Sequence, residues 1–378
     1  MNLTTNELIN LKYMMKVISI TTWLMLLILA GCSDASPYAE EPSAQERTIT
    51  LNLDITTRAD ELLPDNSEPD IIQLWIFDNN ENLITYVVSS QNVWTPVGTD
   101  GIDIKTTLQT EIEAENIDVN QSFKIYLLLN QPYTDDGKGS TTPVDFSDVK
   151  TLDELKGKMF VLTEYKGDNK VPMTGEGTTT FPSVEGNKII FDASINATRC
   201  VAKLGIYCTK GNLSSTLTIN QVTLSKVPDK GYLFKPDDYS LISYSESGKN
   251  LLSESKQISS YYTEDMPPYS NNSWDEEAEG SFEEISSPYL LENPNGEVTD
   301  DGFLQVNGSI TDDDKRYCIT LSYTLNGVGY TQNIYVSQIK RNQYSKIYIR
   351  INDAITVDDI CCQVNSWTEH EIDVPVFE

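Results

Sequence analysis

Alternation of apolar and polar residues is the feature that most constrains the fold of this chain. It is clearest over residues 48–56, where every second residue is Ile or Leu and the residues between them are Thr, Asn or Asp. A period of two is typical of a β-strand with one apolar and one polar face. The apolar positions are Ile49, Leu51, Leu53 and Ile55. Because Arg58 and Ala59 follow this run, a cut between them would remove the strand from the chain.

Loss of a strand would leave a sheet incomplete. The gap would be an apolar groove with unpaired backbone N–H and C=O groups on both sides, and such groups pair readily with another strand. A run of matching pattern lies far along the chain, at Ile372, Val374 and Val376. We therefore expect residues 48–56 to be a removable strand. The tail, residues 360–378, is either an ordinary closing strand or a strand donated to another subunit.

A hydrophobic leader precedes the removable strand. Lys16 is followed by an apolar run that stops at Cys32, and the residues after Cys32 are polar. This order is typical of an export signal and not of a membrane span. The end of the run, Leu29-Ala30-Gly31-Cys32, resembles the lipobox of bacterial lipoproteins, in which the cysteine is acylated. Acyl chains at Cys32 would hold the precursor on a membrane, and a plain secretory signal is the alternative.

Composition excludes some classes of function. The formal net charge of −30 and the sequence pI of about 4.2 would repel nucleic acid and anionic membranes. His370 is the only histidine and lies in the tail, and neither HExxH nor a P-loop is present. No GxSxG stands in a strand-turn-helix setting. We therefore expect no enzyme, no cofactor, no metal site and no nucleic-acid partner.

Five cysteines follow Cys32, namely Cys200, Cys208, Cys318, Cys361 and Cys362. Export permits disulfides, but an odd number of cysteines cannot all pair within one chain. Two of the five, at positions 200 and 208, lie on one predicted strand roughly 26 Å apart when extended, which excludes a bond between them. We interpret most of the five as small buried apolar residues.

The chain divides into four expected regions, the last of which contains an insertion. Residues 1–31 are the signal peptide, of which residues 1–13 are read as an over-long gene start, and residues 32–58 are a propeptide with the removable strand. Two domains follow, over 59–193 and 194–378. Residues 229–300 form an insertion in the second domain, rich in acids and tyrosines, which either stack on sugar rings or pack the insertion onto its domain.

Strand patterns recur along most of the two domains, with one short helix at Thr151, where Thr151 and Glu154 fit a capping box. The predicted strands cover residues 71–77, 83–88, 102–112, 123–130, 188–191, 200–208, 217–224, 317–325, 328–336 and 344–351. The chain is therefore predicted to be all-β.

Together these stretches resemble the Bacteroidales fimbrillin family, the subunits of the type V pilus. Each segment is short, and the resemblance lies in their joint order and spacing. The segments are the lipobox at Cys32, Thr57-Arg58, Val171-Pro172-Met173, Thr198-Arg199-Cys200-Val201-Ala202-Lys203, Leu290-Leu291-Glu292-Asn293, Lys340-Arg341-Asn342-Gln343-Tyr344, and Val364 followed by Trp367. The resemblance implies two transthyretin-like β-sandwich domains with one short helix and a C-terminal donor strand.

The resemblance also implies a function. The chain would be a structural pilus subunit, exported as a lipoprotein precursor, cleaved after Arg58 by a trypsin-like protease and polymerised by donor-strand exchange. Arg47 is the rival cleavage site, but a cut there would keep the strand and open no groove. The implied partners are other copies or related pilus subunits, the outer membrane through the lipid, the protease, and a host or bacterial surface receptor.

The implied location is the cell outer membrane and the extracellular fimbrium. Two alternatives stay open at this point. One is a fimbrial tip adhesin, and the other is an outer-membrane surface lipoprotein that binds glycan.

Overall fold

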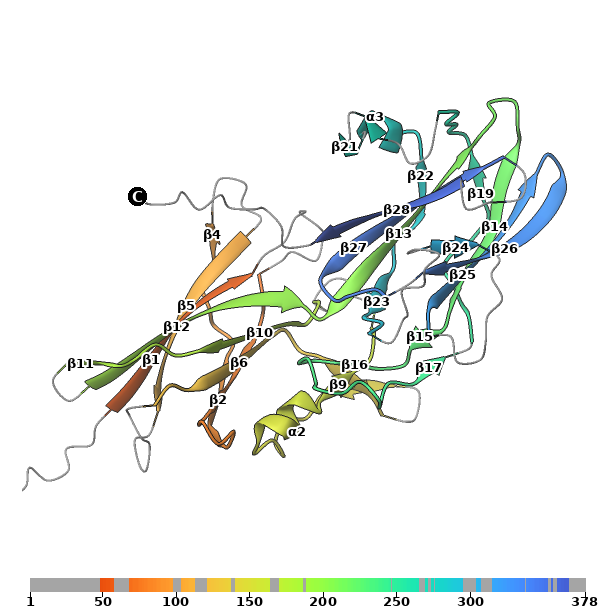
Figure 1. Cartoon of the computed structure of the whole chain (residues 1–378). Coiled ribbons are helices and arrows are strands. Elements are labelled where there is room, and N and C mark those ends of the chain that lie inside the picture. The colour runs from red at the N-terminus through yellow and green to blue at the C-terminus, as the bar shows by residue number, and fades with distance from the viewer. Residues whose placement is uncertain are drawn as a thin grey trace, which may run out of the picture.

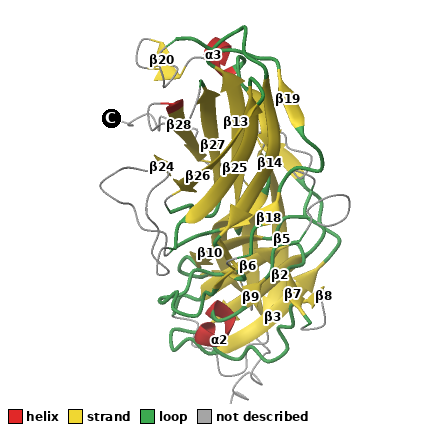
Figure 2. Ribbon diagram, turned by 90° about the vertical axis from the view of Figure 1, so that its right-hand side faces the viewer, coloured by secondary structure: helices red, strands yellow, loops and turns green. Residues whose placement is uncertain are grey.

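The structure is a computed structural model. It describes residues 48–57, 68–97, 103–112, 121–136, 140–163, 170–185, 188–245, 247–264, 269–270, 273–274, 276–294, 304–306, 315–336, 338–352, 355 and 359–366. Most of these residues are in β-strands, which gather into two sandwiches placed end to end (Figure 1). Figure 2, turned by 90°, shows helix α2 at the bottom of the view, near β9 and β3, and α3 beside the second sandwich. The predicted all-β sandwich fold is confirmed.

The first sandwich is one sheet that folds over on itself, with the strand order β3-β2-β6-β10-β12-β1-β5-β4. Its strands are β1 (Thr48–Thr57), β2 (Ile72–Phe77), β3 (Leu83–Ser89), β4 (Thr95–Val97), β5 (Asp103–Ile112), β6 (Lys124–Leu129), β10 (Met173–Thr178), β11 (Ser183–Glu185) and β12 (Lys188–Arg199). The long strand β12 joins the two halves, because β1 pairs along ten of its residues and β10 only near its end. One apolar core lies between the halves.

The second sandwich has two sheets around its own apolar core. One sheet has the order β22-β13-β27-β28 with β23 beside β13, and the other has the order β18-β14-β25-β26-β24 with β19 beside β14. The strands are β13 (Val201–Lys210), β14 (Leu217–Ser225), β18 (Lys249–Asn250), β19 (Lys256–Ile258), β22 (Glu283–Ser286), β23 (Tyr289–Leu291), β24 (Leu304–Val306), β25 (Tyr317–Leu325), β26 (Val328–Val336), β27 (Gln343–Ile351) and β28 (Ile360–Ser366).

Shorter elements connect these strands. They are β7 (Tyr133–Asp135), β8 (Thr141–Pro143), α2 (Leu152–Lys156), β9 (Met159–Phe160), β15 (Val227–Pro228), β16 (Gly231–Tyr232), β17 (Tyr244–Ser245), β20 (Tyr269–Ser270), β21 (Ser273–Trp274) and α3 (Glu276–Glu279). The hairpin between β25 and β26 turns at Asn326 and Gly327, which both have positive φ, as the turn of a tight two-residue hairpin requires.

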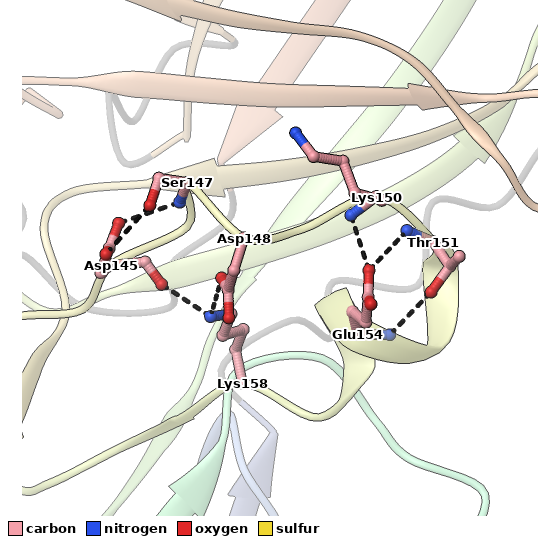
Figure 3. A network of polar contacts seen from close by, with 7 residues as sticks. All are labelled: Asp145, Ser147, Asp148, Lys150, Thr151, Glu154 and Lys158. Atoms are coloured by element: carbon pink, nitrogen blue, oxygen red, sulfur yellow. Dashed lines mark hydrogen bonds and ion pairs between the residues drawn. The ribbon is translucent and has the colours of Figure 1, made fainter.

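Helix α2 begins where the capping box predicts it (Figure 3). The Glu154 N–H donates to Thr151 Oγ1 at 3.3 Å, and Glu154 Oε2 accepts from the Thr151 N–H at 2.9 Å. Nearby, Lys158 Nζ donates to the Asp145 carbonyl at 2.8 Å and forms an ion pair with Asp148. These contacts satisfy the free N–H groups at the helix start and fix the loop that leads into it.

The passage from the first sandwich to the second corrects the predicted domain boundary. Strand β12 continues past residue 194 to Arg199, and β13 begins at Val201, so Cys200 alone separates the two strands. Ile195 and Ala197 are buried in the core of the first sandwich. The alternation of apolar and polar residues in β12 continues up to Arg199. Such a local pattern does not indicate which of the two sandwiches a strand belongs to. The change therefore comes at Cys200, six residues after the predicted position.

The described part of the tyrosine-rich insertion packs onto the rest of the molecule. Tyr232 is buried and contacts Tyr239 with ring centroids 5.9 Å apart. Phe282 lies between Tyr262 and Tyr348, at 5.4 and 5.3 Å. These rings are used in packing, which favours the packing interpretation over sugar stacking for this part of the insertion.

Candidate strand-exchange site

Strand β1 is a central strand whose backbone is paired on both sides. It runs parallel to β12, from the pair Thr48–Lys188 to the pair Thr57–Ala197. On its other side it runs antiparallel to β5, with Leu53 opposite Leu108. A strand in this position satisfies its own N–H and C=O groups and those of two neighbours. Its removal would leave two strands with unpaired edges facing each other.

The apolar face of β1 is fully buried. Ile49, Leu51, Leu53 and Ile55 are each 0% exposed, as their alternation predicts. They pack in the first core against side chains from both halves of the folded sheet, which include Leu74, Ile76, Ile125, Leu127, Phe191 and Ile195. Full burial of each such side chain stabilises the fold by about 1.5–3 kcal/mol. Without β1, the first sandwich would have an open apolar groove between β12 and β5, and we use "groove" below for this site.

The polar face of β1 is tied to both neighbours by side-chain hydrogen bonds. Asn52 Nδ2 donates to Asp192 Oδ1 on β12 at 2.9 Å, and Gln109 Nε2 on β5 donates to Asn52 Oδ1 at 3.1 Å. Two residues further along β1, Asp54 Oδ1 accepts a hydrogen bond from Thr107 Oγ1 at 3.0 Å. These groups are solvent-exposed, so each bond adds little to stability, but together they favour one register of β1.

Several predicted site residues lie outside the described residues. Arg58 and Ala59 come directly after Thr57, the last residue of β1, but the structure describes neither of them. The same holds for Cys32, Arg47 and the tail residues Ile372, Val374 and Val376. Processing, lipidation, removal of β1 and donation of the tail therefore stay predictions.

The first run of the predicted donor tail belongs to the chain's own second sandwich, which corrects the extent of that tail. Residues 360–366 form β28, which pairs antiparallel with β27 from the pair Ile349–Ile360 to the pair Gln343–Ser366. Ile360 is buried in the second core, and Cys362 packs against it. A donated segment would therefore begin after Ser366.

Four of the short segments on which the resemblance depends meet at one place, the junction between the sandwiches. Cys200 N–H donates to the Pro172 carbonyl at 2.9 Å. Asn342, with a positive φ of 55°, donates its N–H to the Val201 carbonyl at 2.8 Å and accepts the Arg199 N–H on its side-chain oxygen at 3.2 Å. Asparagine tolerates this left-handed backbone better than most residues. Asn342 thus links the end of β12, through its side chain, to the start of β13, through its backbone N–H.

A largely buried ion pair completes the junction. Arg341 pairs with Glu292, and its guanidinium also donates to the carbonyls of Leu233 at 2.6 Å and Tyr232 at 2.7 Å. Burial alone would lower the pKa of Arg341, but the hydrogen bond and charge of Glu292 raise it, so the guanidinium stays charged. Sequence reasoning gave Arg341 and Glu292 no role; the available signal was a charged residue directly after the buried pair Leu290-Leu291.

A third apolar core surrounds this junction. It joins the outer face of the first sheet, at Trp75, Phe77 and Leu128, to Leu152 and Leu155 of α2. From the second sandwich it takes in residues that include Val201, Leu233, Phe234, Leu291 and Tyr344. The two sandwiches therefore share a continuous packed apolar interface.

Within the described residues, the five cysteines are free thiols. No bond joins Cys200 to Cys208, as their spacing predicts, and these two and Cys318 are buried. Burial raises the pKa of Cys200 to about 11 and that of Cys361 to about 12, so both stay protonated at neutral pH. Their chemistry is that of small apolar side chains.

Other kinds of site were sought in the same part of the chain. The described residues contain no group of three or more His, Cys, Asp or Glu side chains placed to hold a metal ion. In these residues, too, no helix has the length and apolar character that crossing a membrane requires.

Comparison with known proteins identifies the fold. No protein-family model and no curated protein matches the sequence. A fimbrial assembly protein from Parabacteroides distasonis matches the structure with a TM-score of 0.51 at 10% identity, over 85% of this chain and 100% of that chain. The tip fimbrial protein Mfa3 from Porphyromonas gingivalis, with a C-terminal truncation, matches with a TM-score of 0.50 at 12% identity, over 84% of this chain and 100% of that chain. The chain therefore shares its fold with fimbrial proteins of the Bacteroidales.

Proposed function

We propose that this chain is a member of the Bacteroidales fimbrillin family and a structural, non-enzymatic subunit of a cell-surface fimbrium. The observation that carries the proposal is β1, a central strand whose apolar face is fully buried and which ends directly before Arg58. A fold shared with a fimbrial assembly protein and a tip fimbrial protein supports the same class of function.

The proposed assembly has three steps. The precursor is exported and acylated at Cys32, which holds it on the outer membrane. A trypsin-like protease then cuts between Arg58 and Ala59, and β1 leaves with the lipid-bearing segment. Finally, the tail of another copy enters the groove, so that subunits join into an extracellular fimbrium.

The energetics of the groove favour such an exchange. An inserted strand would restore most of the backbone hydrogen bonds that β12 and β5 make with β1, except for the one N–H that Pro375 lacks. Ile372, Val374 and Val376 would fill three of the four apolar positions, each contributing about 1.5–3 kcal/mol before the cost of ordering the tail. An empty groove would be unstable, which explains why β1 is present in the precursor.

The position of the cut can be tested with two matched variants. Arg47 precedes Thr48, the first residue of β1, so a cut there would leave β1 attached to the sheet. We expect Arg58→Ala to give a lipid-bound monomer and Arg47→Ala to polymerise normally. The measurement is the N-terminal residue and the polymer content of surface-extracted protein, and normal polymers from Arg58→Ala would contradict the site.

The tail can be tested in the same way. We expect deletion of residues 371–378 to leave a folded monomer that does not extend a polymer. A double substitution, Ile372→Asp with Val374→Asp, should act like the deletion, whereas Asp373→Ala changes a residue between the apolar positions and should keep polymerisation. Electron microscopy of the extracted protein distinguishes these outcomes.

The alternative hypothesis is that the chain is a surface lipoprotein that binds glycan. It would keep both Cys32 and β1, whereas the proposed subunit loses them. Intact mass separates the two, because the lipoprotein begins at acylated Cys32 and the mature subunit begins at Ala59. A tip adhesin would also be processed, and its place at the end of a fimbrium would be seen by immunogold labelling.

A further inference from the structure

The groove has two ends that face different parts of the molecule. At one end Thr48 lies opposite Lys188, beside the hairpin of β11 and β12; we call this end the outer mouth. At the other end Thr57 lies opposite Ala197, two residues before β12 ends at the junction; we call this end the inner mouth. In Figure 1, β11 lies at the end of the first sandwich that is remote from the second.

The chain leaves β28 on the junction side of its own second sandwich. Ser366 pairs with Gln343, and the neighbouring Asn342 accepts a hydrogen bond from the Arg199 N–H at the end of β12. Figure 1 shows the arrow of β28 pointing toward the first sandwich. The C-terminal end of β28 therefore lies on the side of the inner mouth of its own copy.

Chain length decides which copy the tail can serve. In a strand with the direction of β1, Ile372 would take the place of Leu51 and Val376 that of Ile55. Leu51 is six residues from Thr57, which places it about 20 Å from the inner mouth. Ile372 is also six residues from Ser366, and six fully extended residues span about 20–22 Å. To enter its own groove in this direction, the tail would first have to run from the inner mouth to the outer mouth. That path would use all six residues, and none would remain to cross from β28 to the groove or to reverse direction at the outer mouth.

We propose that the inserted strand has the direction of β1, and that it enters through the outer mouth from a second copy. The outer end of one first sandwich then contacts the junction region of the next copy, close to Ser366. This inference rests on the proposed function. A strand in the reverse direction would enter at the inner mouth, where the chain's own tail starts, and that closure would compete at an effective concentration in the millimolar range. Insertion in the direction of β1 therefore favours polymerisation, because the chain's own tail is too short to enter its own groove in that direction.

The surface of the outer mouth supports a contact between copies. Phe181 is 86% exposed and Val184 is 70% exposed. Val184 is on β11, opposite Ile189 of β12, and Phe181 is three residues earlier. Two large apolar side chains exposed this close together keep apolar surface in contact with water, which is unfavourable unless another surface covers them. A second copy whose tail enters beside them would bring such a surface.

Photo-crosslinking tests the arrangement in assembled polymers. We place p-benzoylphenylalanine at Val184 of the full chain and map the crosslinked peptides by mass spectrometry. The expected products join Val184 to peptides of a second copy around Gln343 and Ser366. Products that join Val184 to the far end of a second sandwich, at Leu213 or Val328, would overturn the inference, and so would polymers without any crosslink between copies.

A pair of double substitutions provides the matched control. Phe181→Asp with Val184→Asp should slow polymer growth at least about tenfold, because covering each apolar side chain favours the contact and a tenfold change needs only a small free energy. Leu213→Asp with Val328→Asp changes two side chains that are 62% and 54% exposed at the opposite end of the molecule, and should not slow growth. Equal growth rates for the two double variants would contradict the inference.

Failure of this inference can be told apart from failure of the proposed function. If the chain forms no polymers, or forms them without residues 371–378, the proposed function fails and this inference fails with it. If polymers depend on the tail but Val184 crosslinks to the far end of a second sandwich, only the proposed arrangement fails. Melting temperatures of the monomeric variants, which should equal that of the unsubstituted chain, exclude a folding defect as the cause.

Discussion

The first strand of each sandwich occupies the same kind of position. Strand β1 pairs parallel with β12 and antiparallel with β5, and β13 pairs parallel with β27 and antiparallel with β22 and β23. Each presents four fully buried side chains to its core. These are Ile49, Leu51, Leu53 and Ile55 in β1, and Ala202, Leu204, Ile206 and Cys208 in β13.

The two strands differ in how they are attached. Cys200 joins β13 directly to β12, Asn342 bonds to both strands, and Arg341 fixes the adjoining segment. Nothing comparable holds β1 in the described residues, where its contacts are those of pairing, of the core and of a few exposed side chains. Under the proposed function, this difference explains why β1 and not β13 is the strand to be exchanged: β1 precedes the first sandwich in sequence, whereas removal of β13 would require cutting the chain at the junction.

The largest expected effect comes from removing one core side chain in each strand. Leu53→Ala and Leu204→Ala should each cost about 2–5 kcal/mol of unfolding free energy in the uncleaved precursor, because each leaves a cavity in a packed core. In the mature polymer only Leu204→Ala should still be destabilising, since Leu53 has left with β1. Urea unfolding of both forms measures this, and a lasting cost of Leu53→Ala would show that β1 stays in place.

The next largest effect is expected at the Arg341–Glu292 ion pair, which holds the segment next to β13 in place. Arg341→Ala should cost about 2–3 kcal/mol, because it leaves the largely buried Glu292 carboxylate without its partner and frees two carbonyls. The double variant Arg341→Met with Glu292→Leu should recover part of that loss by removing the unpaired charge. Urea unfolding compares the two, and a double variant less stable than Arg341→Ala would contradict this reading of the pair.

A smaller effect is expected on the polar face of β1. Asn52→Ala removes the hydrogen bonds to Asp192 and Gln109 and should cost about 1 kcal/mol or less in the precursor. It should also speed the loss of β1 after cleavage, because these bonds hold the strand in register. Mass spectrometry follows strand release over time; Asn220→Ala on β14, an exposed site bonded to Thr324, is the control and should not change the rate.

The smallest effect concerns pH and the strand beside β13. Burial alone would raise the pKa of Glu283 on β22, but hydrogen bonds from Ser260 and Ser259 and the charge of Lys256 lower it below the usual 4.5. A pKa lowered by folding stabilises the protein above the unfolded value, and this contribution is lost as the pH falls through the folded pKa. Acidification below about pH 4.5 should therefore lower the melting temperature less in Glu283→Gln than in the unsubstituted chain.

Local pattern was enough to predict several elements. The alternation in β1, the capping box of α2 and the strands at 317–325 and 328–336 are all encoded within about ten residues, and the structure has each of them. Burial of the apolar positions of β1 followed from the same alternation. These features are predictable because short-range geometry alone determines them.

Features that depend on distant residues could not be predicted in this way. The parallel pairing of β1 with β12 joins residues about 140 positions apart, and nothing in either strand specifies the other. The domain boundary was placed too early for the same reason. The junction needs Arg341, Glu292 and Asn342 from separate segments, so its chemistry is visible only after the chain has folded.

The single-residue link at Cys200 has a mechanical consequence. Because only Cys200 separates β12 from β13, a pull along a fibre would pass from one sandwich to the other through two strands joined by a single residue. The ten paired positions between an inserted strand and β12 would then be loaded in shear, all together, instead of being peeled apart one after another. If subunits join as proposed, tension would be shared along the whole length of the groove.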